Sequence, residues 1–195
     1  MRVLGIDPGL TASGYGIVDT NGKQESLAEA GVIRPAGREL SLRLASLHRS
    51  MIELLEQWRP EVLVIEEVYS KYSHPRTAIL MAHARGAMCV AAGSVKLPVV
   101  HYAASEVRRA LTGNGRASER QVREMVCRRL GLATPRGGKA ASLRSTSRTQ
   151  AHDDHVYDAL ALALCHAGRA RGAGTRPAVP SKTPSERVRR KRDRR

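Results

Sequence analysis

The sequence contains no phenylalanine, and aromatic residues make up only 3% of its 195 positions. We therefore do not expect a protein that reads single strands by stacking bases on aromatic rings. Three widely spaced cysteines argue against a disulfide framework or a zinc ribbon and favour a reducing cytoplasm. No apolar run reaches the ~18 residues of a membrane-spanning helix. Asp7 places a carboxylate where a signal peptide would have its apolar region, so we do not expect a signal peptide.

Positive charge is present in excess, with a formal net charge of +15 at pH 7. Residues 1–107 hold 11 basic and 11 acidic side chains, whereas residues 108–148 hold 11 and 2. Residues 149–168 hold 3 acidic and no Lys or Arg side chains, and residues 169–195 hold 11 basic and 2 acidic ones. Two basic segments around a short acidic patch are typical of a protein that binds a polyanion beside an acidic site. Duplex or branched nucleic acid fits this pattern best.

Hydrophobic periodicity predicts one α/β domain over residues 1–168. Strands are expected at about 1–6, 14–19, 26–33, 62–65 and 99–102, and helices at about 39–58, 76–92, 105–111, 118–130 and 154–167. Three antiparallel strands followed by strands that alternate with helices imply a mixed five-stranded sheet flanked by helices. Residues 134–150, which are basic and polar, are predicted to form a mobile loop. Residues 169–195 are predicted to be a disordered basic tail.

Three carboxylates stand at the ends of predicted elements. Asp7 and Glu66 each end a strand, and Asp158 lies one turn inside the last helix. His155 precedes Asp158 by three residues and shares its helix face. Asp7 and Glu66 also have simpler interpretations, since Asp-Pro-Gly is a common turn sequence and a strand end meets solvent.

Scattered carboxylates with a nearby histidine suit metal-assisted hydrolysis of a phosphodiester. Two Mg²⁺ ions about 3.5–4 Å apart can activate the attacking water and stabilise the leaving oxygen. A zinc site built from His152, His155 and Asp158 is an alternative, but no cysteine partner is near and the oxygen-rich set favours Mg²⁺. Asp153 and Asp154 are interpreted as residues that cap the helix start.

Six motifs follow one another along residues 1–168 in a fixed order. They are Gly5-Ile6-Asp7-Pro8-Gly9, Gly14-Tyr15-Gly16, Ile65-Glu66-Glu67-Val68-Tyr69, Ala84-Arg85-Gly86, Gly113-Asn114-Gly115 with Gln121-Val122, and Asp158-Ala159-Leu160-Ala161-Leu162-Ala163. Together they closely resemble the RuvC family of bacterial Holliday-junction resolvases. The resemblance implies an RNase H-like fold, a homodimer, and paired, symmetric, metal-dependent nicks in opposite strands of a four-way DNA junction during recombination and repair. It also implies two Mg²⁺ ions per site, with Mn²⁺ as a substitute, and a branch-migration complex as partner.

The resemblance further implies four catalytic and metal-binding positions: Asp7, Glu66, His155 and Asp158. Family members carry either Asp or His at the position of His155, which would bind metal or assist the attacking water. Glu67 is interpreted as a carboxylate outside the ligand set. Tyr69 stands where the family has an aromatic residue that stacks at the junction crossover, although a half-buried tyrosine ending a strand is the alternative.

Phosphate contacts are expected from arginines. Many relatives carry a DNA-contacting lysine where this chain has Glu119. We infer that Arg116 and Arg120, which flank this position, take over its role, and that Arg108 occupies another basic position of the family. The basic tail either attracts DNA without regard to sequence or is a solvated extension.

Two other functions are consistent with parts of the sequence. A non-catalytic DNA-binding protein of the same fold would not need Asp7, Glu66 and Asp158 together. An actin-like phosphotransferase also begins with a strand and a Gly-Ile-Asp turn. Its nucleotide site needs two such domains, however, and residues 1–168 are too few for them.

Overall fold

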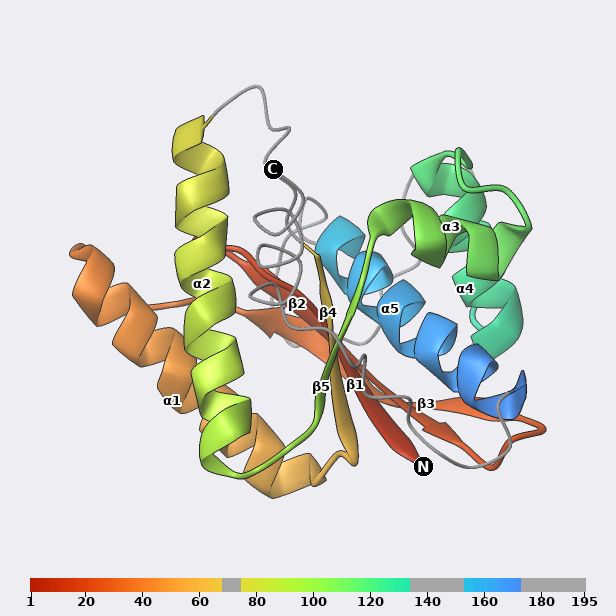
Figure 1. Cartoon of the computed structure of the whole chain (residues 1–195), viewed down its shortest axis with the longest axis horizontal. Helices are drawn as coiled ribbons and strands as arrows, with labels where there is room; N and C mark the ends of the chain where they lie inside the picture. Colours follow the sequence, from red (N-terminus) through yellow and green to blue (C-terminus); the bar gives the residue numbers. More distant parts are fainter. Residues whose placement is uncertain (68–74, 134–152, 173–195) are drawn as a thin grey trace, which may run out of the picture.

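Five strands form one mixed sheet in the order β3-β2-β1-β4-β5 (Figure 1). They are β1 (Arg2–Asp7), β2 (Ser13–Thr20), β3 (Glu25–Ile33), β4 (Val62–Glu66) and β5 (Val99–Tyr102). β1 pairs antiparallel with β2 and parallel with β4, and β4 pairs parallel with β5. The computed structural model describes residues 1–67, 75–133 and 153–172. The five-stranded sheet predicted from the sequence is confirmed.

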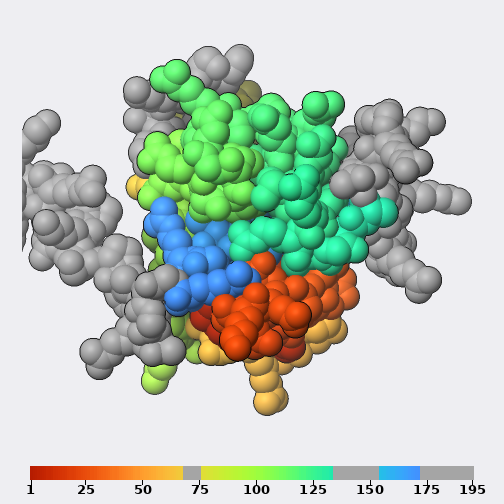
Figure 2. Space-filling view, turned by 90° about the vertical axis from the view of Figure 1, so that its right-hand side faces the viewer, coloured from red at the N-terminus to blue at the C-terminus, as the bar shows by residue number. Residues whose placement is uncertain are grey.

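Helices cover both faces of this sheet. One face carries α1 (Leu40–Trp58) and α2 (Pro75–Ser94), whereas α5 (Asp153–Gly172) crosses the other (Figure 1). Beside α5 pack α3 (Ala104–Thr112) and α4 (Glu119–Leu130), and Figure 2 shows these three helices together on one side of the molecule. None of the helices in the described ranges is long and apolar enough to cross a membrane.

Side chains along β1 and β4 alternate between the two cores. Val3 and Val64 belong to the core beneath α5, whereas Leu4 and Ile65 belong to the core beneath α1 and α2. Successive side chains of a strand point to opposite faces. Two residues beyond Val64, the side chain at position 66 therefore returns to the α5 face, and the same alternation applies to position 7 in β1.

Glycines allow the backbone of α5 to lie directly on the sheet. A Cβ atom at Gly5 of β1 would stand 2.0 Å from the carbonyl oxygen of Ala159. A Cβ atom at Gly14 of β2 would stand 2.0 Å from the carbonyl oxygen of His155. Any side chain at these two positions would push the helix away, so the glycines of the first two motifs fix the height of α5 above β1 and β2.

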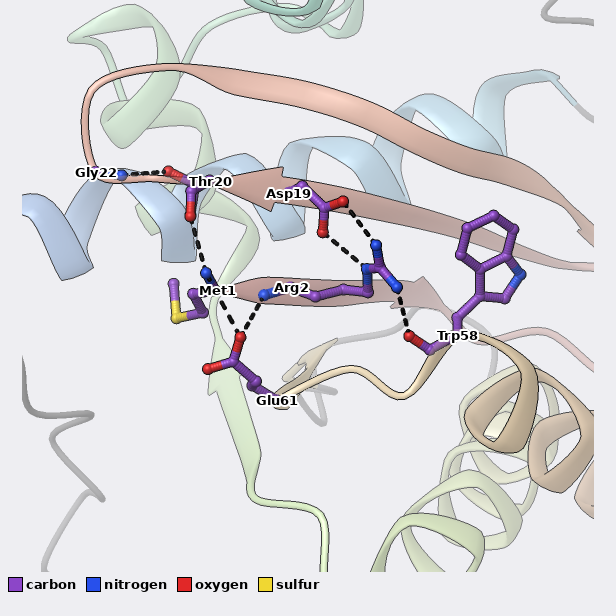
Figure 3. Close-up of polar contacts among 7 residues, drawn as sticks. All are labelled: Met1, Arg2, Asp19, Thr20, Gly22, Trp58 and Glu61. Carbon is purple, nitrogen blue, oxygen red and sulfur yellow. Dashed lines mark hydrogen bonds and ion pairs between the residues drawn. The ribbon is translucent and has the colours of Figure 1, made fainter.

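The end of β1 remote from Asp7 is held by a network around Arg2 (Figure 3). Two guanidinium nitrogens of Arg2 donate to the carboxylate of Asp19 at 2.8 Å, and a third donates to the carbonyl of Trp58 at 2.8 Å. The backbone amide of Arg2 donates to Glu61 at 2.9 Å. These bonds join β1 to β2 and to the connection between α1 and β4. The Arg2 guanidinium also lowers the pKa of Asp19.

The sequence predicts two helix caps, Ser105 for α3 and Ser118 with Gln121 for α4. Ser118 and Gln121 form the expected reciprocal cap, with Ser118 N–H donating to Gln121 Oε1 at 2.9 Å and Gln121 N–H to Ser118 Oγ at 3.3 Å. The prediction that Ser105 caps the preceding helix was wrong. That helix begins one residue earlier, and the amide of Ala103 donates to Glu106 Oε2 at 3.1 Å.

The last helix is longer than predicted. It was expected to end near Ala167, because glycine and arginine follow, but α5 continues to Gly172. Arg169 donates to Glu106 at 3.2 Å, and its guanidinium lies 4.6 Å from the ring centre of Tyr102. Arg171 pairs with the buried carboxylate of Glu25 at 2.5 Å. These contacts with distant elements stabilise the final turns. The predicted mobile loop from 134 and the rest of the predicted tail, from 173, lie outside the described residues.

Candidate active site

Asp7 and Glu66 end neighbouring parallel strands at the same edge of the sheet. Ile6 and Ile65 are paired in register, and the two carboxylates come directly after them. Asp7 is buried, with 7% of the residue exposed, and Glu66 is partly buried. Both positions face the side of the sheet that α5 covers. The first turns of α5 therefore meet the two carboxylates.

His155 of α5 contacts Asp7 directly. Its Nδ1 atom lies 2.5 Å from Asp7 Oδ2, which makes a short hydrogen bond between the helix and β1. The carboxylate stabilises the protonated imidazole, so this bond raises the pKa of His155 above its ordinary value even though partial burial opposes the rise. The His155 side chain is 43% exposed and that of Asp7 is 10% exposed. His155 thus stands between the buried carboxylate and solvent.

The negative charges of Asp7 and Asp158 act on Glu66, and that of Asp7 also acts on Asp158. Burial, followed by the charges of Asp7 and Asp158, raises the pKa of Glu66 to about 7. Asp158 is exposed at its position on α5. Partial desolvation, followed by the charges of Asp7 and Glu119, raises its pKa to about 6. The site therefore holds more negative charge than its neighbours compensate, which is an environment that attracts a cation.

The donor chemistry of the three carboxylates fits a divalent metal ion. Across residues 1–67, 75–133 and 153–172, no three Asp, Glu, His or Cys side chains form a ready-made metal cage. Mg²⁺ does not require one, because it keeps several waters and is commonly held by one or two carboxylates together with substrate phosphates. His152, part of the zinc alternative, lies outside the described residues.

Of the arginines predicted to contact DNA, Arg108 is the one whose charge acts on Glu66. It projects from α3, and its positive charge partly offsets the rise in the pKa of Glu66. Arg116 and Arg120 are exposed before and within the first turn of α4. Arg120 also approaches Glu124 at 3.6 Å on the same helix. The three arginines thus lie on α3, in the connection from α3 to α4, and in the first turn of α4.

Glu119 and Tyr69 are the remaining positions with a predicted relation to DNA. Glu119 is the first residue of α4, and its charge acts on Asp158, so this acidic residue adds to the negative field of the site. Tyr69 lies outside the described residues. Its predicted contact with the junction remains a prediction.

Sequence reasoning missed an interaction behind Glu66. Arg85, noted only as part of the Ala84-Arg85-Gly86 motif, donates from Nε to the backbone carbonyl of Glu66 at 3.2 Å. Its Nη2 atom donates to His101 Nδ1 at 2.9 Å. A histidine on a four-residue strand carries no pattern that predicts such a contact. The motif around Arg85 was the only available signal.

Comparison with known proteins identifies the chain's relatives. Its sequence matches the model of the family described as "Crossover junction endodeoxyribonuclease RuvC" over residues 3–166. The chain belongs to the RuvC family. A RuvC crossover junction endodeoxyribonuclease from Saccharopolyspora erythraea is 43% identical over 177 residues, which cover 89% of this chain and 80% of the relative. A RuvC protein from Polynucleobacter asymbioticus is 37% identical over 173 residues, covering 88% of this chain and all of the relative.

Solved structures of RuvC proteins have the same fold. Thermus thermophilus RuvC is 33% identical and superimposes with a TM-score of 0.72 over 91% of this chain and 99% of its own. The same protein in complex with a Holliday junction substrate gives a TM-score of 0.74 over the same shares of both chains. The yeast mitochondrial Holliday junction resolvase Ydc2, at 17% identity and a TM-score of 0.60, shares the fold. The RuvC match includes every candidate catalytic residue: Asp7, Glu66, His155 and Asp158.

Proposed function

We propose that this chain is a crossover junction endodeoxyribonuclease that resolves four-way DNA junctions by paired, symmetric nicks in opposite strands. The observation that carries this proposal is the meeting of Asp7 and Glu66 with the first turns of α5, in a chain of the RuvC family. A RuvC relative has been solved with a Holliday junction substrate. The biological roles that follow are recombination and DNA repair.

The metal in this proposal is Mg²⁺, with two ions per site and Mn²⁺ as a substitute. Asp7, Glu66 and Asp158 would hold it, since each presents carboxylate oxygens in a field of excess negative charge. Bound divalent ions supply positive charge that favours deprotonation of the attacking water and stabilises the leaving oxygen. His155 either binds metal or accepts the proton of that water. Because its Nδ1 is engaged by Asp7, Nε2 is the ring atom left for this role.

A homodimer is part of the proposal, because two nicks in opposite strands need two active sites. The exposed face of α2 suits contact with a second copy. Ile79 and Val90 on this helix are 56% and 62% exposed, which is unusual for large apolar side chains. At Gly86 and Gly93, a Cβ atom would have no neighbour within 4 Å, so another backbone could approach closely.

The DNA would lie along the basic side of the site. Arg108, Arg116 and Arg120 are the proposed phosphate contacts, and Tyr69 is the proposed stacking residue at the crossover. The association with a branch-migration complex and the cytoplasmic location rest on the sequence analysis alone and stay predictions.

A synthetic four-way junction tests the function directly. The junction has immobile arms and a short mobile core, is labelled on each strand in turn, and is incubated with protein and Mg²⁺. Wild-type protein should make symmetric nicks in opposite strands, whereas linear duplex and the Asp7→Asn variant should give none. EDTA should abolish nicking and leave junction binding intact.

Other results of this assay would distinguish the proposed metal-dependent nuclease from the alternative mechanisms and functions. Nicking that survives chelation would overturn the metal-dependent mechanism. Binding without nicks over a series of core sequences would indicate a non-catalytic junction-binding protein. Binding with nicks in only some cores would support the nuclease and define its sequence preference.

A further inference from the structure

Both polar groups of the peptide bond between Glu66 and Glu67 are hydrogen-bonded. Its N–H, which belongs to Glu67, donates to the carbonyl of Tyr102 in β5 at 2.9 Å. Its carbonyl, which belongs to Glu66, accepts from Nε of Arg85 at 3.2 Å. Glu66 is the last residue of β4, so this is where the chain leaves the sheet. A side chain from α2 thus completes the hydrogen bonding of the final peptide group of the strand.

Arg85 is itself oriented by His101. The Nη2 atom of Arg85 lies 2.9 Å from His101 Nδ1, and a guanidinium can only donate. His101 must therefore offer the lone pair of Nδ1 and carry its proton on Nε2. Burial and the charge of Arg85 lower the pKa of His101, which favours this neutral form. The planar guanidinium of Arg85 has several N–H donors in a fixed arrangement, so it can bond to a carbonyl and an imidazole at the same time. A lysine ammonium does not span both acceptors in this way.

We propose that Arg85 is a positioning residue that, together with His101, fixes the backbone at Glu66 so that its carboxylate is aimed at the divalent metal. This inference rests on the proposed function. The direction of the Glu66 side chain depends on the two peptide groups that flank its Cα atom. The preceding peptide belongs to the sheet, and the following one is fixed by Arg85 and Tyr102. Functional groups must be held to within about 0.5 Å, and neighbours that orient a metal ligand are a common means of doing so.

The position of Arg85 excludes a simpler role in metal binding. It is a cation, so it cannot ligate Mg²⁺, and its bond goes to the main chain of Glu66 rather than to the carboxylate. The arginine whose charge acts on Glu66 is Arg108 rather than Arg85. We therefore expect an effect of Arg85 on the metal to pass through the geometry of β4. A change at Arg85 should alter metal affinity without altering the number of carboxylates at the site.

The test compares Arg85→Met, Arg85→Lys and His101→Leu with wild-type protein. Arg49→Met is the matched control, because Arg49 is an exposed arginine on the neighbouring helix α1. Mn²⁺ binding is measured without DNA by the electron paramagnetic resonance signal of the free ion. The Mg²⁺ concentration for half-maximal nicking, junction binding in EDTA, and hydrogen exchange of the Glu67 amide are measured in parallel.

We expect Arg85→Met to weaken Mn²⁺ binding and raise the half-saturating Mg²⁺ concentration by about 10- to 100-fold. Exchange of the Glu67 amide should accelerate, and junction binding in EDTA should stay unchanged. Arg85→Lys, which can still reach the carbonyl, should fall between Arg85→Met and wild type. His101→Leu should shift the same quantities in the same direction, and Arg49→Met should match wild type.

Unchanged Mn²⁺ affinity in a folded Arg85→Met protein would overturn the inference. Should that variant fail to fold, Arg85→Lys and His101→Leu carry the test, and unchanged Mn²⁺ affinity in both would overturn it equally. A wild-type protein that binds Mn²⁺ yet nicks no junction would instead overturn the proposed function. The two failures are thus distinguishable, because Mn²⁺ binding is measured without a reaction.

Discussion

His155 and Asp7 are joined by a 2.5 Å hydrogen bond between the first turns of α5 and the end of β1. The two residues lie 148 positions apart in the sequence. The bond gives Asp7 a positively charged neighbour whenever the imidazole is protonated, and it raises the pKa of His155. In the absence of metal, the imidazolium therefore supplies part of the positive charge that the carboxylates require.

Replacing His155 with glutamine should destabilise the metal-free protein in a pH-dependent way. The pKa of His155 is raised from 6.5 in the folded state, so its contribution is complete below that value and is lost as pH rises through the folded pKa. Because the side chain is partly exposed, the expected loss at pH 5.5 is only about 0.5–1 kcal/mol, and almost none should remain at pH 9. Urea unfolding in EDTA at both pH values measures this difference.

A control for this prediction is available on α2. His83 is exposed, and His83→Gln should change the unfolding free energy little at either pH. A loss in His155→Gln that is equal at pH 5.5 and pH 9 would show that the charged contact with Asp7 does not contribute.

Glu66→Gln should stabilise the metal-free protein at pH 8 while abolishing nicking. The folded state raises the pKa of Glu66 from 4.5 to about 7, so it binds the proton more tightly than the unfolded chain does. Stability therefore falls as pH rises through this window, and the charged carboxylate is destabilising above it. At about 1.4 kcal/mol per pH unit the ceiling is about 3 kcal/mol, and we expect about 2 kcal/mol.

Urea unfolding at pH 4 and pH 8 checks the sign, since the gain should be absent at pH 4. Adding Mg²⁺ should stabilise wild-type protein more than Glu66→Gln. Glu67→Gln, at the exposed neighbouring position, is the control and should show no comparable gain at pH 8. A Glu66→Gln protein less stable than wild type at pH 8 would contradict the interpretation.

Gly14→Ala should displace α5 and impair both stability and nicking. A Cβ atom at this position would stand 2.0 Å from the carbonyl oxygen of His155, and backbone cannot rotate aside as a side chain can. We expect a loss of about 3 kcal/mol, with a large fall in nicking, because His155 and Asp158 move with the helix. Thermal unfolding and the junction assay measure the two effects.

Gly168→Ala is the matched control for this substitution. Gly168 lies in α5, and a Cβ atom there would meet only the Arg129 side chain at ordinary contact distance, 3.5 Å from Nη2. Alanine favours helix over glycine, so this variant should gain up to about 1 kcal/mol. Equal effects of the two substitutions would show that close approach of α5 is not what Gly14 provides.

Arg116→Ala and Arg120→Ala should each weaken junction binding and reduce its dependence on salt. Each phosphate contact contributes about 0.9 to the magnitude of the slope of log affinity against log salt. Glu119→Lys should change the slope in the opposite sense, because it replaces a negative charge near Asp158 with a positive one. Binding in EDTA over a series of salt concentrations measures all three. An unchanged slope in both alanine variants would contradict the inference that these arginines replace the family's lysine.

The sequence was sufficient to predict the sheet and the placement of the two strand carboxylates, because both depend on local periodicity. Short apolar runs bounded by turns predict the strands, and parallel neighbours bring Asp7 and Glu66 to one edge. The length of α5 could not be predicted this way. Its last turns depend on Arg171 pairing with Glu25, whose position beside the helix is known only once the chain has folded.

The same limit applies to Arg85 and His101. They lie on different elements, and only the packing of α2 against the end of β5 brings them together. The roles assigned to the candidate catalytic residues and to Tyr69 stay predictions, since they concern metal and DNA.

The alternation of β4 has a consequence for mutations that change its length. Glu66 and Glu67 are adjacent glutamates, but Glu67 follows the end of β4 and its charge acts on His101, which contacts Arg85 of α2. Glu67 therefore cannot replace a lost Glu66. Deleting one residue within Val62–Ile65 would change which side chains face α5, because the side chains on one side of the deletion would move from one core to the other. β4 can therefore accept changes in side-chain volume far more readily than a change in the number of its residues.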